Sequence, residues 1–265
     1  MTALLGIARK EIKVAFTTPI AYVVSFFFTL MTSLLFYQQL LDYERRLQRA
    51  RHFEDAELLA QLNFNDVILA YVFLNVQLIF IFLIPMLTMR MFAEERRQRT
   101  MELLMTSPIS PLQIVAGKYL SFLWVLFCLC ALVTAYPLIL TIFGSNSLVG
   151  ASVLDWNTTL LGIAGIFLMG AMFGAIGFAC SSLTENQIVA ALLSFFILLL
   201  LWFVARLGQE TPGDLGAFLL FLSPLGHVVR FIKGILHLGD VLYFLSGTFF
   251  FLFLSHRMVE GWRWR

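Results

Sequence analysis

Long apolar runs alternate with shorter polar stretches along most of this chain. A helix that crosses a membrane needs about 20 mostly apolar residues, and most of the runs reach that length. We predict six membrane-spanning helices, the last of which has the shortest apolar core. They cover about residues 20–41, 67–89, 119–143, 159–180, 187–205 and 239–257. The pattern therefore predicts an all-α integral membrane protein with one transmembrane domain over residues 1–265.

Composition supports this class of protein. Hydrophobic residues make up 60% of the chain and charged residues 13%, with a mean hydropathy of +0.88. A soluble domain is about 45–50% apolar and about 25% charged. The net charge of +2 gives no indication of nucleic-acid binding. All three cysteines fall in predicted spans without metal-ligand spacing, so we expect neither a metal site nor a disulfide.

Six crossings place both termini on one side of the membrane. With the N-terminus inside, eleven of the 18 lysines and arginines lie on the inner side and seven on the outer side. Basic residues favour the cytoplasmic side. We expect a multi-pass protein of the bacterial inner (cytoplasmic) membrane with cytoplasmic N and C termini.

Two polar segments flank the first span. Residues 3–16 carry an apolar stripe of Leu5, Ala8, Ile12 and Phe16 with basic residues beside it, which predicts an amphipathic helix at the inner membrane interface in contact with lipid. Residues 42–64 are polar but lack glycine and proline, so spans 1 and 2 are expected to project outward as a helical hairpin. This hairpin is either a solvated extension or a binding surface.

The stretch between spans 5 and 6 is neither a span nor an ordinary loop. Apolar "LGAFLLFL" is followed by a helix start at Ser223-Pro224. Irregular backbone at membrane depth is tolerated only where protein or a water-filled cavity covers it. We therefore predict re-entrant outer helices between these spans, with His227 and His237 as interfacial residues and not metal ligands.

Polar and small residues inside the spans allow two interpretations each. Asn75 and Gln77 are candidates for a substrate path, but they could equally join helices by hydrogen bonds. The small residues of span 4 predict close helix packing, either within one subunit or across a dimer interface. They are Gly170, Gly174, Ala171 and Ala175.

The segment between spans 2 and 3, "EERRQRTMELLMTSPISPLQIVAGK", has the most distinctive pattern. Mixed charges at helical spacing predict a short amphipathic helix from residue 94 that Thr106-Ser107-Pro108 ends, because the residue before proline avoids the α region. Ser110, Pro111 and Gln113 then predict a capping box that starts a new helix, with Lys118 at the membrane interface. The alternatives are a stiff lever fixed to two spans and a linker held at the headgroups.

These residues resemble the cytoplasmic segment of type 2 ATP-binding-cassette exporter permeases. The resemblance runs through an acidic stretch, a "T-x-E-L-L" core, an "S-P-x-S" turn and a trailing "G-K". The matching residues are Glu94, Glu95, Thr100, Glu102, Leu103, Leu104, Ser107, Pro108, Ser110, Gly117 and Lys118. Arg99 stands where the family usually has glycine. Residues 10–24 and 222–246 further resemble the gliding-motility-type (GldF-like) branch, which is related to NosY-like permeases.

The resemblance implies a coupling helix that docks on a separate cytoplasmic ATP-binding-cassette ATPase. The implied coupling residues are Glu94, Glu95, Arg96, Arg97, Arg99, Thr100, Glu102, Leu103, Leu104, Thr106, Ser107 and Pro108. ATP and Mg²⁺ would be bound by that partner, and this chain would carry no cofactor. A second permease copy or a similar permease would complete a dimer, with an extracytoplasmic auxiliary subunit as a further candidate partner.

Three functions are compatible with these features to different degrees. The first is the permease subunit of an exporter, and the second is a subunit that transmits movement to envelope proteins without transport. The third is a membrane-embedded lipid-modifying enzyme, which the sparse polar residues within the spans disfavour. The chain has no G-x-x-x-x-G-K-[ST] loop, so we expect it not to be an enzyme. The sequence does not identify a substrate.

Overall fold

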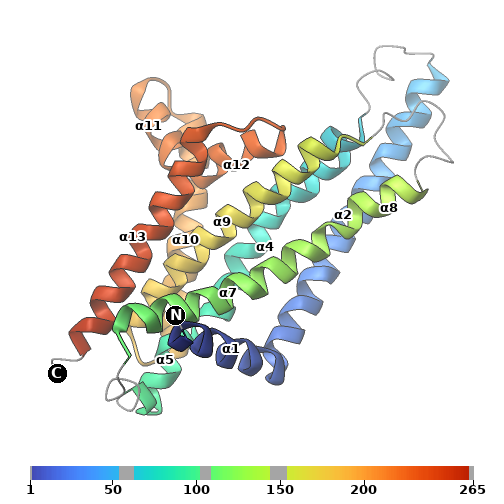
Figure 1. The fold of residues 1–265 in the computed structure, drawn as a ribbon. Helices are drawn as coiled ribbons and strands as arrows, with labels where there is room; N and C mark the ends of the chain where they lie inside the picture. The colour runs from blue at the N-terminus through green and yellow to red at the C-terminus, as the bar shows by residue number, and fades with distance from the viewer. Residues whose placement is uncertain (1, 54–62, 102–108, 144–153, 263–265) are drawn as a thin grey trace.

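The computed structural model describes residues 2–53, 63–101, 109–143 and 154–262, and these form helices and turns without strands (Figure 1). Among them are six segments long and apolar enough to cross a membrane. These segments are Pro19–His52 (α2), Asn65–Arg97 (η1, α4 and α5), Pro111–Phe143 (α7 and α8), Trp156–Leu183 (α9), Gln187–Glu210 (α10) and Leu238–Trp262 (α13). The predicted class, an all-α membrane protein, is confirmed, and the six candidate segments match the six predicted spans.

The first span is longer than its apolar run. Helix α2 continues without a break to His52, through the arginine-rich stretch that follows the apolar residues. The proximal half of the predicted outer extension is therefore a continuation of the span. Residues 54–62 of the predicted hairpin lie outside the described residues.

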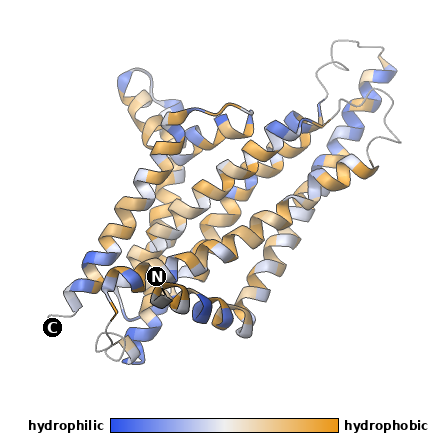
Figure 2. Ribbon diagram, viewed as in Figure 1, coloured by the Kyte–Doolittle hydropathy of each residue, from blue (hydrophilic) through white to orange (hydrophobic). Residues whose placement is uncertain are grey.

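Helix α1 (Thr2–Thr17) and the end of α13 lie at the same end of the bundle, here called the terminal end (Figure 1). Figure 2 shows apolar residues along the middle of the helices and polar residues toward their ends. Helix α1 lies across this end and packs on α7. Leu5 and Phe16 of its predicted stripe are exposed, whereas Ala8 is buried. The apolar stripe is thus divided between the protein and its surroundings.

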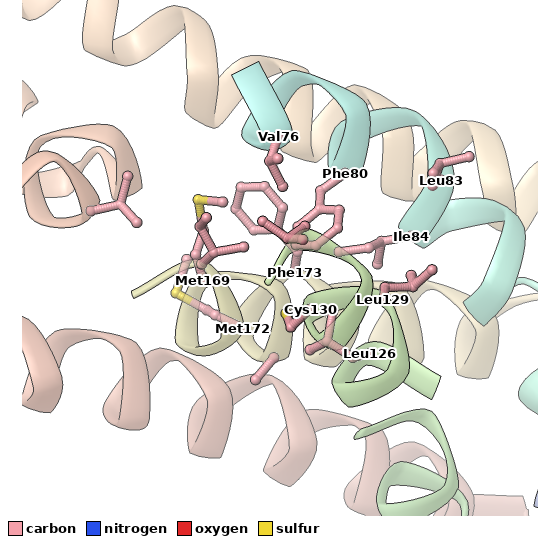
Figure 3. Packing of buried hydrophobic residues seen from close by; sticks show 14 of the residues in the cluster. Val76, Phe80, Leu83, Ile84, Leu126, Leu129, Cys130, Met169, Met172 and Phe173 are labelled. Carbon is pink, nitrogen blue, oxygen red and sulfur yellow. The ribbon is translucent and has the colours of Figure 1, made fainter. Parts of the chain in front are cut away.

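The core lies among α4 (Ala70–Thr88), α7 (Pro111–Val133) and α9. Figure 3 shows Phe80 of α4, Leu126 of α7 and Phe173 of α9 packed together. All three side chains are buried. Helix α9 also contacts α5, α10, α12 and α13, so it is the central helix of the bundle.

Glycines let α7 approach α9 closely. A Cβ atom on Gly174 would lie 2.0 Å from Cε1 of Phe122, and one on Gly170 would lie 2.8 Å from Cδ1 of Leu126. Larger residues would not fit at either position. The GxxxG pair therefore packs against a helix of its own chain, while Ala171 and Ala175 on the same helix are also buried.

Two short helices follow α10. They are α11 (Asp214–Leu222) and α12 (Pro224–Ile232), bent by 73° relative to each other. Both lie at the end of the bundle away from α1, called the opposite end (Figure 1). The side chain of Ser223 accepts a hydrogen bond from the N–H of Leu225, as its role in starting α12 requires.

The segment between spans 2 and 3 departs from the prediction at one point. Helix α5 (Arg90–Arg97) ends in a turn at Gln98 and Arg99, and helix resumes at Thr100. Arg99 has a φ of 56°, in the left-handed region. The predicted uninterrupted helix was therefore wrong at these two residues. The capping box is confirmed, with reciprocal hydrogen bonds between Ser110 and Gln113.

Candidate functional site

A buried lysine joins three helices at the terminal end. Nζ of Lys118 on α7 lies 3.2 Å from Oε1 of Glu11 on α1 and 2.8 Å from Oε1 of Glu95 on α5. The Lys118 side chain is only 2% exposed, so it faces other helices, and its depth at the membrane interface stays a prediction. A lysine is buried only where opposite charges compensate its lost hydration, and two carboxylates do so here.

The close approach of α1 makes this burial geometrically feasible. A Cβ atom on Gly117 would lie 3.0 Å from the side chain of Ile7 and from the carbonyl oxygen of Leu4. The glycine therefore lets α1 lie against α7 beside Lys118. Lys10 approaches Oε1 of Glu11 to 3.4 Å and Oε1 of Glu95 to 3.9 Å from the exposed side.

Helix α5 is fixed to the central helix by one hydroxyl. Oγ of Ser181 on α9 accepts hydrogen bonds from the N–H groups of Phe92 and Ala93, at 3.1 and 3.2 Å. The same hydroxyl donates to the carbonyl oxygen of Met89 at 3.0 Å. The first N–H groups of a helix lack intrahelical partners, so this serine completes the hydrogen bonding where α4 gives way to α5.

Helix α5 is also fixed on its other side. Arg96 donates to Glu185 at 2.7 Å, just beyond the end of α9. Its guanidinium carbon lies 4.5 Å from the ring centroid of Trp262, near the end of α13. The ring of Phe92 is fully buried and makes edge contacts with Phe178 and Trp262. Thus α5 contacts α9 and α13 in addition to Lys118. These contacts together are called the terminal-end cluster, and its members are Glu11, Glu95, Arg96, Lys118, Ser181 and Trp262.

The other predicted coupling residues divide into three groups. Glu94 accepts hydrogen bonds from Arg90 and Gln98, and Thr100 donates to the carbonyl oxygen of Glu95. Arg97 and Arg99 are exposed. The third group lies outside the described residues and comprises Glu102, Leu103, Leu104, Thr106, Ser107 and Pro108.

The two amides of span 2 do not share a site. The side chain of Asn75 donates back to the carbonyl oxygen of Tyr71, one turn earlier. Gln77 is 1% exposed, and among the described residues its amide nitrogen and oxygen have no hydrogen-bond partner. Neither amide joins two helices by a hydrogen bond in the described part of the chain.

A second polar cluster holds the opposite end together. His227 on α12 is 3% exposed, and its Nδ1 lies 2.6 Å from Oδ1 of Asp240 at the start of α13. Arg230 forms a two-point contact with the same carboxylate, and Tyr243 stacks on His227 at 3.9 Å between ring centroids. His227 is therefore a buried link between two helices, and its depth at the membrane interface stays a prediction. His237 is exposed.

The local signals in the sequence did not reveal either cluster. Lys118 and Glu11 are 107 positions apart, and nothing near Lys118 indicates a partner on α1. Among the described residues, no group of three His, Cys, Asp or Glu side chains is arranged to hold a metal ion. The terminal-end cluster is suited to a mechanical task, since its ion pairs and backbone contacts tie α1, α5, α7, α9 and α13 together.

The bundle and its terminal-end cluster define a polytopic membrane protein whose polar contacts tie helices together. The family model for ABC-2 family transporter proteins matches residues 5–256, so the chain belongs to that family. Members of the family are membrane permease components of ABC transporters, generally without enzymatic activity of their own, and normally work with a cytoplasmic ATP-binding-cassette ATPase. In the comparison with individual curated proteins, none matches this chain.

Proposed function

We propose that this chain is the permease subunit of an ATP-binding-cassette exporter in the bacterial inner membrane. Its terminal end, with both termini, faces the cytoplasm. A separate ATPase binds ATP and Mg²⁺, and the permease contributes no cofactor. Two permease chains form the membrane part of the complex, either two copies of this chain or this chain with a similar one.

The observation that carries this proposal is the attachment of α5. The helix is joined to α1 and α7 through Glu95 and Lys118, to α9 through Ser181, and to α13 through Arg96. It leads directly into residues 98–110, the segment proposed to dock on the ATPase. A push on that segment would reach several spans through contacts that are already in place, because packed elements move as units.

The experiment targets two leucines of the docking segment. A double Leu103→Asp, Leu104→Asp variant is co-expressed with an ATP-binding-cassette ATPase that co-purifies with the parent chain. Placing two charges in an apolar contact should abolish co-purification and the stimulation of ATP hydrolysis by the permease. Leu112→Asp, on the exposed face of α7 at the same end, is the matched control and should retain both properties.

The permease must remain folded for this comparison to be informative. Size-exclusion profiles and thermal melting of each variant without ATPase test for folding. If the folded double variant still recovers the ATPase and stimulates it as the parent does, residues 103 and 104 do not couple the two proteins. If only Leu112→Asp loses co-purification and stimulation of ATP hydrolysis, the ATPase binds at α7 and not at residues 103 and 104.

A second candidate function is transmission of movement to envelope proteins without transport. The observation that favours it is the length of α2. Its 34 residues span about 51 Å, whereas the hydrocarbon core of a bilayer is about 30 Å thick. An extracytoplasmic auxiliary subunit could bind the projecting turns, as expected for the gliding-motility-type (GldF-like) branch. ATP-dependent uptake of a substrate into inverted vesicles would favour the exporter.

A further inference from the structure

A cavity of about 540 Å³ lies at the terminal end, lined by α1, α2, α4, α5 and α7. One part of its lining is charged, with residues contributed by α1, α5 and α7. The other part is apolar, with residues contributed mainly by α2, α4 and α7. The charged members are Lys10, Glu11, Arg90, Glu94, Glu95 and Lys118, and the main apolar members are Ile20, Ala21, Leu87, Phe122 and Val125.

The two kinds of lining are arranged by depth. Along α7 the cavity is lined first by Lys118, then by Phe122, and then by Val125. Seven residues of helix extend about 10 Å, so the lining changes from ionic to apolar over about two turns. A molecule that fits this cavity has a charged group at one end and a hydrocarbon chain at the other. Membrane lipids have this form.

The charges select among lipid headgroups. Three acidic and three basic side chains line the charged part, so its formal charge is balanced. Arg90 bonds Glu94 through Nε, and the terminal guanidinium nitrogens of Arg90 have no hydrogen bond within the described part of the chain. They are donors suited to a phosphate, because arginine presents several N–H groups in one plane.

The opposite charge is available on Glu95. Its Oε2 is buried and has no hydrogen-bond partner among the described residues, while Oε1 receives Lys118. A buried carboxylate oxygen without a donor is unfavourable. A primary ammonium, which carries three N–H donors, would satisfy it. Rotation about the last side-chain bond of Glu95, a broad torsion, turns this oxygen toward the cavity that Glu95 lines.

We propose that this cavity binds a phospholipid with a phosphoethanolamine headgroup. The phosphate contacts Arg90, the ammonium donates to Glu95, and an acyl chain lies along Leu87 and Phe122. A choline headgroup lacks the N–H donor, and a glycerol headgroup lacks the positive charge. The proposal goes beyond the transport function and requires only that α1 lies at a membrane surface.

The test uses the purified full-length chain in detergent without any ATPase, so its outcome is independent of coupling. Three lipids with identical acyl chains are titrated: phosphatidylethanolamine, phosphatidylcholine and phosphatidylglycerol. Bound lipid is measured by native mass spectrometry. One charge-assisted hydrogen bond separates the first two headgroups, so phosphatidylethanolamine should bind about tenfold more tightly than phosphatidylcholine.

Two variants locate the binding. Leu87→Trp fills the apolar part of the cavity and should abolish the preference for phosphatidylethanolamine. Met86→Trp is the matched control, because the neighbouring Met86 is 44% exposed and does not line the cavity. Arg90→Gln removes the phosphate donors and should weaken binding of phosphatidylethanolamine and phosphatidylcholine alike. Thermal melting without added lipid identifies variants that fail to fold.

Three results would overturn the proposal. The first is equal binding of phosphatidylethanolamine and phosphatidylcholine to the parent chain. The second is an unchanged preference in folded Leu87→Trp. The third is tighter binding of phosphatidylglycerol than of phosphatidylethanolamine, which would identify a basic site for anionic lipid in place of a zwitterionic one.

Discussion

At the scale of single residues, the state of a charged side chain depends on which helices meet around it. Lys118 and Lys10 contact the same two carboxylates, yet the Lys118 side chain is 2% exposed and that of Lys10 is 60% exposed. Water screens the outer lysine, whereas the inner one relies on its partners. The two lysines therefore provide a matched pair.

Replacing Lys118 by methionine should destabilise the protein strongly. Two largely buried carboxylates would lose their main partner, and breaking a buried pair from one side costs about 3–5 kcal/mol. Lys10→Met should cost less than about 1 kcal/mol. Thermal melting of both variants in the same detergent measures the difference. Equal losses would mean that Lys118 contributes no more than a surface ion pair.

Arg99 presents a second residue-scale case. Its φ of 56° disfavours a residue with a side chain. Arg99→Gly should therefore leave stability unchanged or raise it by up to about 1 kcal/mol. Arg97→Gly, at the last residue of α5, should lower stability by up to about 1 kcal/mol. The stability of the two variants is compared by their denaturation midpoints. Equal losses of stability would contradict a left-handed backbone at Arg99.

At the scale of elements, α9 organises the bundle because its small residues admit large neighbours. Gly170 and Gly174 leave room for side chains of α7, and the hydroxyl of Ser181 forms hydrogen bonds with the backbone at the start of α5. In a membrane, close packing of this kind is a main source of association between helices. The helix is therefore sensitive to added volume along this side.

Gly174→Ala should destabilise the protein despite the better helix propensity of alanine. The new Cβ would lie 2.0 Å from Cε1 of the buried Phe122, and overpacking of this kind costs about 1–3 kcal/mol. Gly6→Ala is the control, since nothing lies within 4 Å of the added Cβ. It should stabilise α1 by up to about 1 kcal/mol. Melting temperatures that rise in both variants would exclude a tight α7–α9 contact.

The start of α9 should respond to pH. The Asp155 carboxylate accepts hydrogen bonds from the Thr158 hydroxyl and from the N–H of Asn157, and these lower the pKa of Asp155 below its usual value. A lowered folded-state pKa means that the stabilisation is complete above the unfolded value of about 3.9 and is lost as pH falls through the lower folded value.

Asp155→Ala tests this linkage. The melting temperature of the variant should lie below that of the parent by a constant amount between about pH 5 and 8, and the gap should shrink below about pH 4. Asp155→Ser keeps an oxygen acceptor without a charge. The melting temperature of Asp155→Ser should therefore exceed that of Asp155→Ala by an amount that does not depend on pH in this range. A gap that stays constant down to pH 3 would show that the Asp155 charge is irrelevant.

At the scale of the whole molecule, local patterns were predictable and long-range contacts were not. The spans follow from apolar length, and the capping box follows from two residues three positions apart. Glu11, one of the two partners of Lys118, lies 107 positions away, and the partner of His227 lies across a turn between two helices. The turn at Arg99 lacks the glycine that would have signalled it. Which helices meet at the two clusters is thus determined by the whole fold, and no local sequence pattern predicts it.

The path of the chain through the membrane depends on the bent pair α11 and α12. If the pair enters and returns, the molecule has six crossings and its termini share a side. If the pair crosses, there are seven crossings and the termini lie on opposite sides. Asp214 and His237 flank the pair and are both exposed, and Gln98 is exposed at the terminal end.

Single cysteines at Asp214, His237 and Gln98, in a chain without its native cysteines, distinguish these two paths. A membrane-impermeant maleimide added to intact cells should label Asp214→Cys and His237→Cys but not Gln98→Cys. After permeabilisation, the maleimide should label all three cysteines.

The His227–Asp240 contact supports this outcome, because it keeps the start of α13 beside α12 at the opposite end. Labelling of only one of positions 214 and 237 in intact cells would establish seven crossings and separate the two termini. Residues 94–108 and the C-terminus would then face different compartments, although Arg96 contacts Trp262 within one cluster.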